Sequence, residues 1–142
     1  MNGMTWLSLV AILFVGGPSA AMAADASIRC PRKTVEVVEG QERWCLRTGR
    51  FGDEMRHGPY LSTYEDGSIR MEGRFSQGLR EGLFLHTHRN GVMASKVRYS
   101  QGKREGVSQE FHDNGRLAVK GSFNGERRVG EWAKWSVSGT LV

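Results

Sequence analysis

Apolar and polar residues alternate with a period of two in three segments of the chain, 69–75, 93–99 and 117–123. The first segment sets apolar and small residues against charged ones: Ile69, Met71, Gly73 and Phe75 against Arg70, Glu72 and Arg74. The next two repeat this arrangement: Met93, Val97 and Tyr99 against Lys96 and Arg98, then Leu117, Val119 and Phe123 against Lys120. Such alternation is typical of strands with one buried and one solvated face. Each segment therefore predicts a β-strand in a half-buried sheet.

A turn signal precedes each of these strands: Asp66-Gly67, Asn90-Gly91 and Asn114-Gly115. Asn-Gly and Asp-Gly tolerate the positive φ values of a type I′ turn, which joins antiparallel strands through two residues. We therefore expect β-hairpins with these turns at their tips. The connections between hairpins are expected to be longer and to lie around Gly78, Gly102 and Gly125.

A two-residue turn also determines which residues face each other across the hairpin. It predicts four pairs: Tyr64 with Ile69, Tyr60 with Gly73, His88 with Met93, and Phe84 with Val97. An aromatic ring opposite a strand glycine covers backbone that would otherwise be exposed. We expect Tyr60 to cover Gly73 in this way.

The hairpins recur every 24 residues, because two sets of glycines advance in step: Gly58, Gly82, Gly106 and Gly130, and Gly67, Gly91, Gly115 and Gly139. A fixed period of this kind indicates a repeat architecture whose units contact mainly their neighbours. The predicted fold is all-β, an elongated antiparallel meander of β-hairpin repeats over residues 46–142. Residues 46–57 align with the second half of a unit and are predicted to form a degenerate first half-repeat. Asn124-Gly125 lies one residue earlier than the period predicts.

The segment Phe75-Ser-Gln-Gly78-Leu-Arg-Glu-Gly82-Leu-Phe84, followed by Asn90-Gly91, resembles the MORN-repeat superfamily, most closely its bacterial antitoxin-like variant. The pattern recurs one repeat later, and the likeness covers residues 46–142. It departs from the family at Ser108, where an aromatic is expected. The resemblance implies a hairpin array with binding or scaffolding roles toward proteins or membranes, and it carries over no catalytic residues.

The first 23 residues carry no charged side chain and contain an apolar run from Trp6 to Val15. This run is shorter than the ~20 residues that cross a bilayer, and Ala21-Met22-Ala23 fits the small-x-small rule for cleavage before Ala24. We therefore predict a signal peptide over residues 1–23 and an exported chain, periplasmic or secreted. A retained signal anchor is the alternative.

The two cysteines, Cys30 and Cys45, both follow the predicted cleavage site. In an exported protein such a pair is expected to form a disulfide. A loop of this length contributes about 3 kcal/mol in the chain-entropy model. We expect the disulfide to hold residues 24–45 as an N-terminal cap against the first half-repeat near Trp44. A metal or redox role is less favoured, because there is no Cys-x-x-Cys pair.

Lys and Arg number 20 against 15 Asp and Glu, which gives a net charge of +5. A positive excess favours anionic partners. Its placement follows the repeat, since one arginine precedes each glycine of the first set by two residues: Arg56, Arg80, Arg104 and Arg128. We expect this arginine row to line one edge of the sheet, where it could bind phosphates or carboxylates.

The alternative for the arginine row is a set of solvated turn residues, neutralised by Glu81 and Glu105 beside them. Nucleic acid is the least favoured anionic partner, because the chain looks exported and carries no known nucleic-acid-binding motif.

Three histidines raise the possibility of a metal site, because His86 and His88 share a strand face and His112 is the 24-residue equivalent of His88. Equivalent positions lie two strands apart, however, roughly 10 Å at normal strand spacing. Semi-buried aromatic filler is the favoured interpretation, so no metal or other cofactor is expected. The sequence contains no nucleophile elbow or zincin motif, and we predict a non-catalytic protein.

Exposed aromatics dominate many binding hot spots. Those that recur on the strand before each turn are the candidate binding residues, with burial in the core as the alternative: Tyr60, Tyr64, Phe84, Trp132 and Trp135. Trp132 and Trp135 are expected on opposite faces of the last strand, so one of them should be exposed unless a partner or a second copy covers it. We predict an exported, non-catalytic repeat module that binds a protein or an envelope component on its sheet face.

Two other functions stay open at this point. The arginine row could bind anionic lipid at a membrane surface, or the chain could be an immunity or antitoxin-like partner of a toxin. Self-association is a further possibility, because an open sheet edge over Trp132–Val142 could pair with a second copy.

Overall fold

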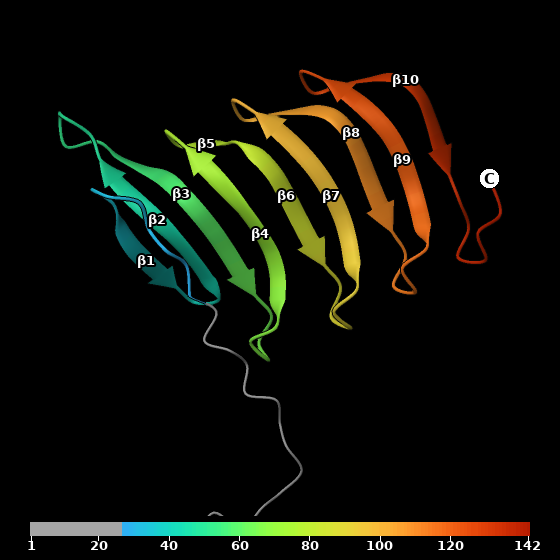
Figure 1. The fold of residues 1–142 in the computed structure, drawn as a ribbon, viewed down its shortest axis with the longest axis horizontal. Helices are drawn as coiled ribbons and strands as arrows, with labels where there is room; N and C mark the ends of the chain where they lie inside the picture. The colour runs from blue at the N-terminus through green and yellow to red at the C-terminus, as the bar shows by residue number, and fades with distance from the viewer. Residues whose placement is uncertain (1–26) are drawn as a thin grey trace, which may run out of the picture.

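The computed structural model describes residues 27–142, which form one all-β sheet (Figure 1). Its ten strands are β1 (Val35–Glu39), β2 (Glu42–Thr48), β3 (Glu54–Thr63), β4 (Ile69–Ser76), β5 (Leu79–Arg80), β6 (Gly82–Thr87), β7 (Met93–Ser100), β8 (Lys103–Phe111), β9 (Leu117–Asn124) and β10 (Arg127–Lys134). The predicted signal peptide, residues 1–23, lies outside the described residues, as do the first three residues of the predicted cap.

Neighbouring strands pair in chain order from β1 to β10, and every pairing is antiparallel. The short β5 leads into β6, and both pair with β4. Figure 1 shows the hairpins side by side in a row, with β1 at one end and β10 at the other. The predicted all-β meander of hairpin repeats is therefore confirmed.

The tight turns lie at the opposite ends of the strands from those predicted. In Gln77-Gly78 and Gln101-Gly102, both residues have positive φ, between 48° and 82°. These pairs join adjacent strands directly, since Ser76 pairs with Leu79 across the first of them. Positive φ at both central positions is characteristic of a type I′ turn. The segments expected to be longer connections are thus two-residue turns.

The Asp-Gly and Asn-Gly pairs instead lie in three-residue loops. Tyr64 N donates to Ser68 O (2.8 Å) and Gly67 N to Tyr64 O (3.0 Å), and Gly67 has a φ of 83°. This pattern is a type I turn followed by a glycine bulge. The Oδ1 atom of Asp66 accepts a hydrogen bond from Ser68 N at 2.9 Å, and Asn90 and Asn114 repeat this bond in the next two loops. These side chains therefore support the loop two residues ahead.

The bulge alters the pairing beside the loop and preserves it farther along the strands. Thr63, not Tyr64, pairs with Ile69, and Thr87, not His88, pairs with Met93, so these two predicted pairs are wrong. Beyond the bulge the predicted pairs are confirmed: Tyr60 with Gly73, and Phe84 with Val97. The extra residue in the loop is compensated by the bulge, so the register of the rest of the hairpin is unchanged.

The same bulge moves the first apolar residue of each strand to the other face. Ile69 is 40% exposed and lies beside Leu61, on the face opposite Met71. Met93 and Leu117 hold the equivalent positions, paired with Thr87 and Phe111. Their predicted place on the buried face is wrong, because simple alternation does not allow for the residue that a bulge adds.

The irregularity at Asn124-Gly125 changes the turn residues but not the period. Asn124 pairs with Arg127 across a two-residue turn, as Ser100 pairs with Lys103 one repeat earlier. The turn consists of Gly125 and Glu126, whose φ values are 56° and 78°. Glycine holds the second turn position in the two earlier repeats, so Glu126 occupies backbone that suits glycine.

The core lies on one face of the sheet, the aromatic face, whose rings are those of Trp44, Tyr60, Phe75, Phe84, Tyr99, Phe123 and Trp132. Ring centroids from Tyr60 to Tyr99 follow one another at 5.2 to 5.7 Å in edge-to-face contacts. Phe123 and Trp132 form a second group, 5.0 Å apart. Edge-to-face packing at these distances is favourable, so the rings bind consecutive strands together.

Glycines on the aromatic face make room for rings from the strand that follows. A Cβ atom on Gly73 would lie 2.5 Å from the Phe84 ring, and one on Gly121 would lie 2.1 Å from the Trp132 ring. Tyr60 pairs with Gly73, but the ring that lies against this glycine is that of Phe84. An aromatic ring therefore covers Gly73 as predicted, but the ring belongs to Phe84 of the next hairpin and not to Tyr60.

At Val97 and Ser108 the larger side chain is on the first strand and the small one is on the strand that follows. Val97 occupies the position that Gly73 holds one repeat earlier, and it pairs with Ser108 on the following strand. Ser108 is 5% exposed. A small residue at this point matches the larger side chain beside it, because interiors are packed to nearly constant density. The departure from the aromatic pattern at Ser108 therefore has a packing explanation.

The Cys30–Cys45 disulfide is present, with the two Cα atoms 5.5 Å apart. It holds the segment before β1 against the face opposite the aromatic face, where Cys45 is fully buried and Pro31 lies against Gly58. Leu61 on that face is 6% exposed. The predicted boundary between cap and array, at residues 45 and 46, falls inside β2, so both parts belong to one sheet.

Candidate binding face

The arginine row lies on the aromatic face, along the edge of the sheet that carries the two-residue turns. Arg80, Arg104 and Arg128 each belong to the second residue pair from such a turn. Each guanidinium carbon stands over a ring: Arg56 is 4.4 Å from the Trp44 centroid, Arg80 5.0 Å from Phe84, Arg104 4.2 Å from Phe123 and Arg128 4.2 Å from Trp132. Guanidinium groups are attracted to aromatic faces at such distances. The predicted arginine row and part of the predicted aromatic set therefore form one surface, the arginine–aromatic ladder, defined by these four pairs.

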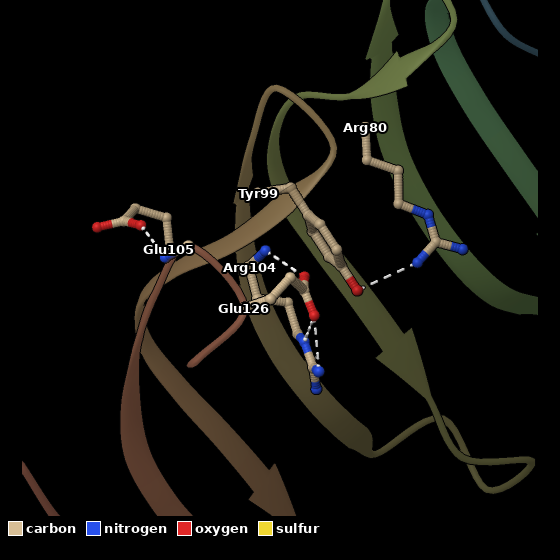
Figure 2. A network of polar contacts seen from close by, with 6 residues as sticks. Arg80, Tyr99, Arg104, Glu105 and Glu126 are labelled. Atoms are coloured by element: carbon tan, nitrogen blue, oxygen red, sulfur yellow. Dashed lines mark hydrogen bonds and ion pairs between the residues drawn. The ribbon is translucent and has the colours of Figure 1, made fainter. Parts of the chain in front are cut away.

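Arg56 and Arg104 also have acidic partners. Arg56 lies 3.9 Å from a carboxylate oxygen of Glu42, a distance typical of a loose ion pair. Arg104 binds Glu126 closely: Nε and Nη2 lie 2.8 Å from Oε2, and the backbone N donates to Oε1 at 2.5 Å (Figure 2). These bonds hold the pKa of Glu126 below its ordinary value and raise the pKa of Arg104.

Arg80 and Arg128 lack such a partner. Arg80 donates from Nη1 to the Tyr99 hydroxyl at 3.1 Å, a bond that Figure 2 shows beside the Arg104 pair. Arg128 has a contact with the Trp132 ring. Within residues 27–142, neither guanidinium has a carboxylate at ion-pair distance. These two arginines are therefore the members of the ladder with positive charge not matched by a neighbouring acid.

Glu81 and Glu105 form no ion pair with the arginine row within residues 27–142. The Oε2 atom of Glu81 accepts from Gln101 N, and that of Glu105 accepts from Gly125 N, each at 2.8 Å. Both carboxylates thus bind the turn of the next hairpin. Each of these acids therefore directs one oxygen to turn backbone of the next hairpin rather than to a guanidinium group.

Of the candidate aromatics, Tyr60 and Phe84 belong to the core, where they are 5% and 2% exposed. Burial raises the pKa of Tyr60. Trp132 and Trp135 are both partly buried, so the prediction that one of them is exposed is wrong. Trp132 packs against Phe123, and its buried Nε1 has no hydrogen-bond partner in the part of the chain that the structure describes.

Tyr64 and two histidines link each hairpin to the next. They occupy equivalent positions and bind backbone carbonyls one repeat along: Tyr64 Oη to Thr87 O at 2.7 Å, His88 Nε2 to Phe111 O at 2.9 Å, and His112 Nε2 to Trp135 O at 2.9 Å. Each side chain donates, since a carbonyl can only accept. No group of three His, Cys, Asp or Glu residues suited to a metal ion occurs in residues 27–142.

His86 lies on the aromatic face, paired with Met71 on one side and Ser95 on the other. Burial lowers its pKa, and the positive charges of Arg80 and Arg70 add to this effect. The imidazole therefore remains neutral at pH values at which an exposed histidine begins to bind protons.

The opposite face of the sheet is also basic. Exposed cations alternate there with exposed apolar side chains: Arg74, Lys96, Arg98 and Lys120 with Leu83, Val107 and Val129. A shallow hollow of about 400 Å³ lies on this face, lined by Ile28, Leu61 and Leu85 among others. Positive charge alone therefore does not distinguish the two faces; stacking of arginines on rings does.

The stacking was missed at the sequence level although a signal was present. Each arginine of the row precedes a core position by four residues, as Arg80 precedes Phe84 and Arg128 precedes Trp132. In a strand, residues an even number apart share a face. Glu126, the partner of Arg104, had a weaker signal in the sequence. The third turn is Gly125-Glu126 where the first two are Gln-Gly, so a carboxylate stands in this turn alone of the three.

No protein-family model matches the chain, and no curated protein or solved structure shows significant similarity to it. None of the secondary-structure elements over residues 27–142 is a helix long and apolar enough to cross a membrane.

Proposed function

We propose that the chain is an exported, non-catalytic, MORN-like repeat module that binds a protein or an envelope component on its aromatic face. The observation that carries this proposal is the arginine–aromatic ladder, in which four guanidinium groups at 24-residue spacing stand over rings of one sheet face. A guanidinium presents several donors in a fixed plane that matches carboxylates. Stacking limits its orientations, which lowers the entropy lost when a partner binds.

Export is supported by the disulfide between Cys30 and Cys45. Disulfides persist in oxidising compartments and are rare where thiols are kept reduced. The uncharged, apolar start of the sequence agrees with export to the periplasm or beyond.

The proposal is tested by reversing charge on one face at a time. Arg80→Glu/Arg128→Glu changes the aromatic face, and Arg74→Glu/Arg98→Glu makes the same change in net charge on the opposite face. In a pull-down from envelope extract with oxidised protein, we expect the wild type and the Arg74/Arg98 variant to retain the same protein. The Arg80/Arg128 variant should lose it. Equal retention by all three proteins would exclude the aromatic face as the binding surface.

Anionic lipid is the second candidate, favoured by the two guanidinium groups of the ladder that have no acidic partner within residues 27–142. Cosedimentation with phosphatidylglycerol vesicles, compared with phosphatidylcholine vesicles, distinguishes it from protein binding. Lipid binding through the ladder predicts sedimentation that is lost at high salt and in the Arg80→Glu/Arg128→Glu variant. Such a result without any captured protein would replace the protein partner by a membrane surface.

A further inference from the structure

The Arg104–Glu126 pair shows how a carboxylate binds to one member of the arginine–aromatic ladder. One oxygen of Glu126 accepts from the backbone N of Arg104, and the other accepts from the guanidinium group that lies over the Phe123 ring. The donors therefore comprise one backbone group and one stacked side chain. Hydrogen bonds between ionised partners are stronger than neutral ones, which is consistent with an acid held at a turn position of positive φ.

The same backbone framework recurs one repeat earlier at Arg80. The carbonyl of Arg104 accepts from Glu126 N at 3.1 Å, and the carbonyl of Arg80 accepts from Gly102 N at 2.9 Å. Gly102 thus lies beside Arg80 as Glu126 lies beside Arg104, and its φ of 81° is close to the 78° of Glu126. At this turn position the two sites differ in the carboxylate, which glycine does not supply. They also differ in the ring beside the guanidinium group, which is Tyr99 at Arg80 and Phe123 at Arg104.

Arg80 is positioned to receive such a group from outside the chain. Its guanidinium stands over the Phe84 and Tyr99 rings, at 5.0 and 5.2 Å, and the Tyr99 hydroxyl occupies one of its donors. An open hollow of about 550 Å³ lies between the two sites, lined by Phe75, Leu79, Arg80, Tyr99, Arg104 and Glu126 among others. Figure 2 shows Arg80 and the Arg104–Glu126 pair on either side of Tyr99.

We propose that Arg80, with Gly102 beside it, is a binding site for an aspartate or glutamate side chain of a protein partner. This inference rests on the proposed function, because it assigns the chemistry by which the aromatic face recognises its partner. Glu126 serves as the internal example of the ligand, and the hollow gives an extended acidic segment access from the solvent. The arginine–carboxylate fit depends on the planar fork of donors, which lysine does not provide.

The test uses oxidised, isotope-labelled protein and a blocked tetraglutamate peptide as the probe, with blocked tetraglutamine as its neutral match. We expect tetraglutamate to shift the amide signals of Arg80 and Gly102 and the Nε–H signal of Arg80, and tetraglutamine to shift none of them. Arg80→Gln and Arg80→Lys should each weaken binding by at least about tenfold, the usual effect of losing a charge-assisted hydrogen bond.

Two more variants test the site without removing Arg80. Gly102→Glu would supply an internal carboxylate on backbone that Glu126 already tolerates, and it should prevent the peptide from binding. Glu126→Gln would free Arg104, and it should add a second set of peptide-dependent shifts there. Backbone spectra of the free proteins identify any variant that fails to fold, and the four variants need not all fold for the test to decide.

Shifts that persist in Arg80→Gln, or that centre on Arg74, Lys96 and Arg98 of the opposite face, would overturn the assignment. So would stronger shifts at Arg80 with inorganic phosphate than with tetraglutamate. The outcome is separable from that of the charge-reversal pull-down. A captured partner with no response to tetraglutamate would remove this inference alone, and a specific response without any captured partner would remove the proposed function alone.

Discussion

Gly73 and Phe84 show how closely one residue constrains another in this sheet. Phe84 is 2% exposed, and its ring occupies the space in which a side chain on Gly73 would begin. The φ of Gly73 is not in the left-handed region, so its role is to leave room rather than to allow an unusual backbone conformation. Single atoms therefore matter at this position.

Gly73→Ala is expected to lower the free energy of unfolding by about 1–3 kcal/mol, the usual range for overpacking a core. The new Cβ would lie 2.5 Å from ring atoms, so the ring or the backbone must move. Urea denaturation of the oxidised protein measures the change. In a Phe84→Ala background the same substitution should be nearly neutral, and an undiminished loss there would show that the strain has another source.

His86 predicts a dependence of stability on pH. Its pKa in the folded chain is lowered, mainly by burial, from an ordinary value of 6.5. As the pH falls below about 6.5, the unfolded chain binds a proton at His86 that the folded chain still excludes. The free energy of unfolding should therefore decrease with acidification until the folded-state pKa is passed. Well above the ordinary pKa, where the histidine is neutral in both states, this contribution should be constant.

His86→Gln removes the titrating group while keeping a polar side chain. Urea denaturation between pH 7.5 and pH 5.5, a window of about two units around the ordinary histidine value, should show a smaller decline for the variant than for the wild type. Parallel curves for the two proteins would mean that other groups cause the decline.

At the scale of elements, the sequence patterns predicted the strands of the hairpins but assigned the two-residue turns and the longer loops to the wrong ends of those strands. Asp-Gly and Asn-Gly are strong signals for two-residue turns, yet Asp66 adopts a side-chain bond to Ser68 N that favours a three-residue loop. Gln77 takes positive φ at the other end of the strand, where the turn backbone is held by Arg56 O through Gly78 N. This bond to the preceding repeat is tertiary, and local turn preferences do not contain it.

The sequence could predict which residues belong to the candidate site but not the contacts between them. The 24-residue spacing identified Arg80 and Arg104 as equivalent, and Phe84 as a strand aromatic. The bond from Arg104 to Glu126 joins residues 22 apart on different hairpins, and its geometry depends on where the turn places the carboxylate. That placement follows from the pairing of β9 with β10, which a one-residue irregularity in the sequence obscured.

Val97 and Ser108 provide a test of packing between elements. They pair across β7 and β8, where a glycine and an aromatic occupy the equivalent positions one repeat earlier. Ser108→Phe alone should be destabilising by about 1–3 kcal/mol through overpacking. Val97→Gly alone should also be destabilising, because it opens space and adds a flexible strand residue.

The double variant Val97→Gly/Ser108→Phe should recover much of both losses, since it restores the glycine–aromatic pair of the neighbouring repeats. A double-mutant cycle from urea denaturation gives the coupling free energy, expected to be favourable and of order 1 kcal/mol or more. Additive losses would mean that the two side chains do not share the same space.

At the scale of the whole molecule, the rings of the aromatic face form two separate groups, and one disulfide crosslinks the sheet. The first group runs from Trp44 to Tyr99 and includes the least exposed ring, that of Phe84, whereas Phe123 and Trp132 form the second. The substitution of Ser108 for a ring separates them. The disulfide lies at the end of the sheet that carries the first group. Stability should therefore be unevenly distributed along the array, as in other repeat proteins whose units contact mainly their neighbours.

Native-state hydrogen exchange should show this gradient, with the slowest amides in β3, β4 and β6 and faster exchange in β9 and β10. Cys30→Ala/Cys45→Ala removes the crosslink of a 15-residue separation, which contributes about 3 kcal/mol in the chain-entropy model. The loss of protection should be largest in β2 and β3, where Cys45 and Leu61 are buried beneath the N-terminal segment. It should be small in β9 and β10, because their ring contacts do not involve that segment. A uniform loss across all strands would instead indicate that the sheet unfolds as one cooperative unit, in which packing across Val97 and Ser108 couples the two aromatic groups as firmly as a ring would.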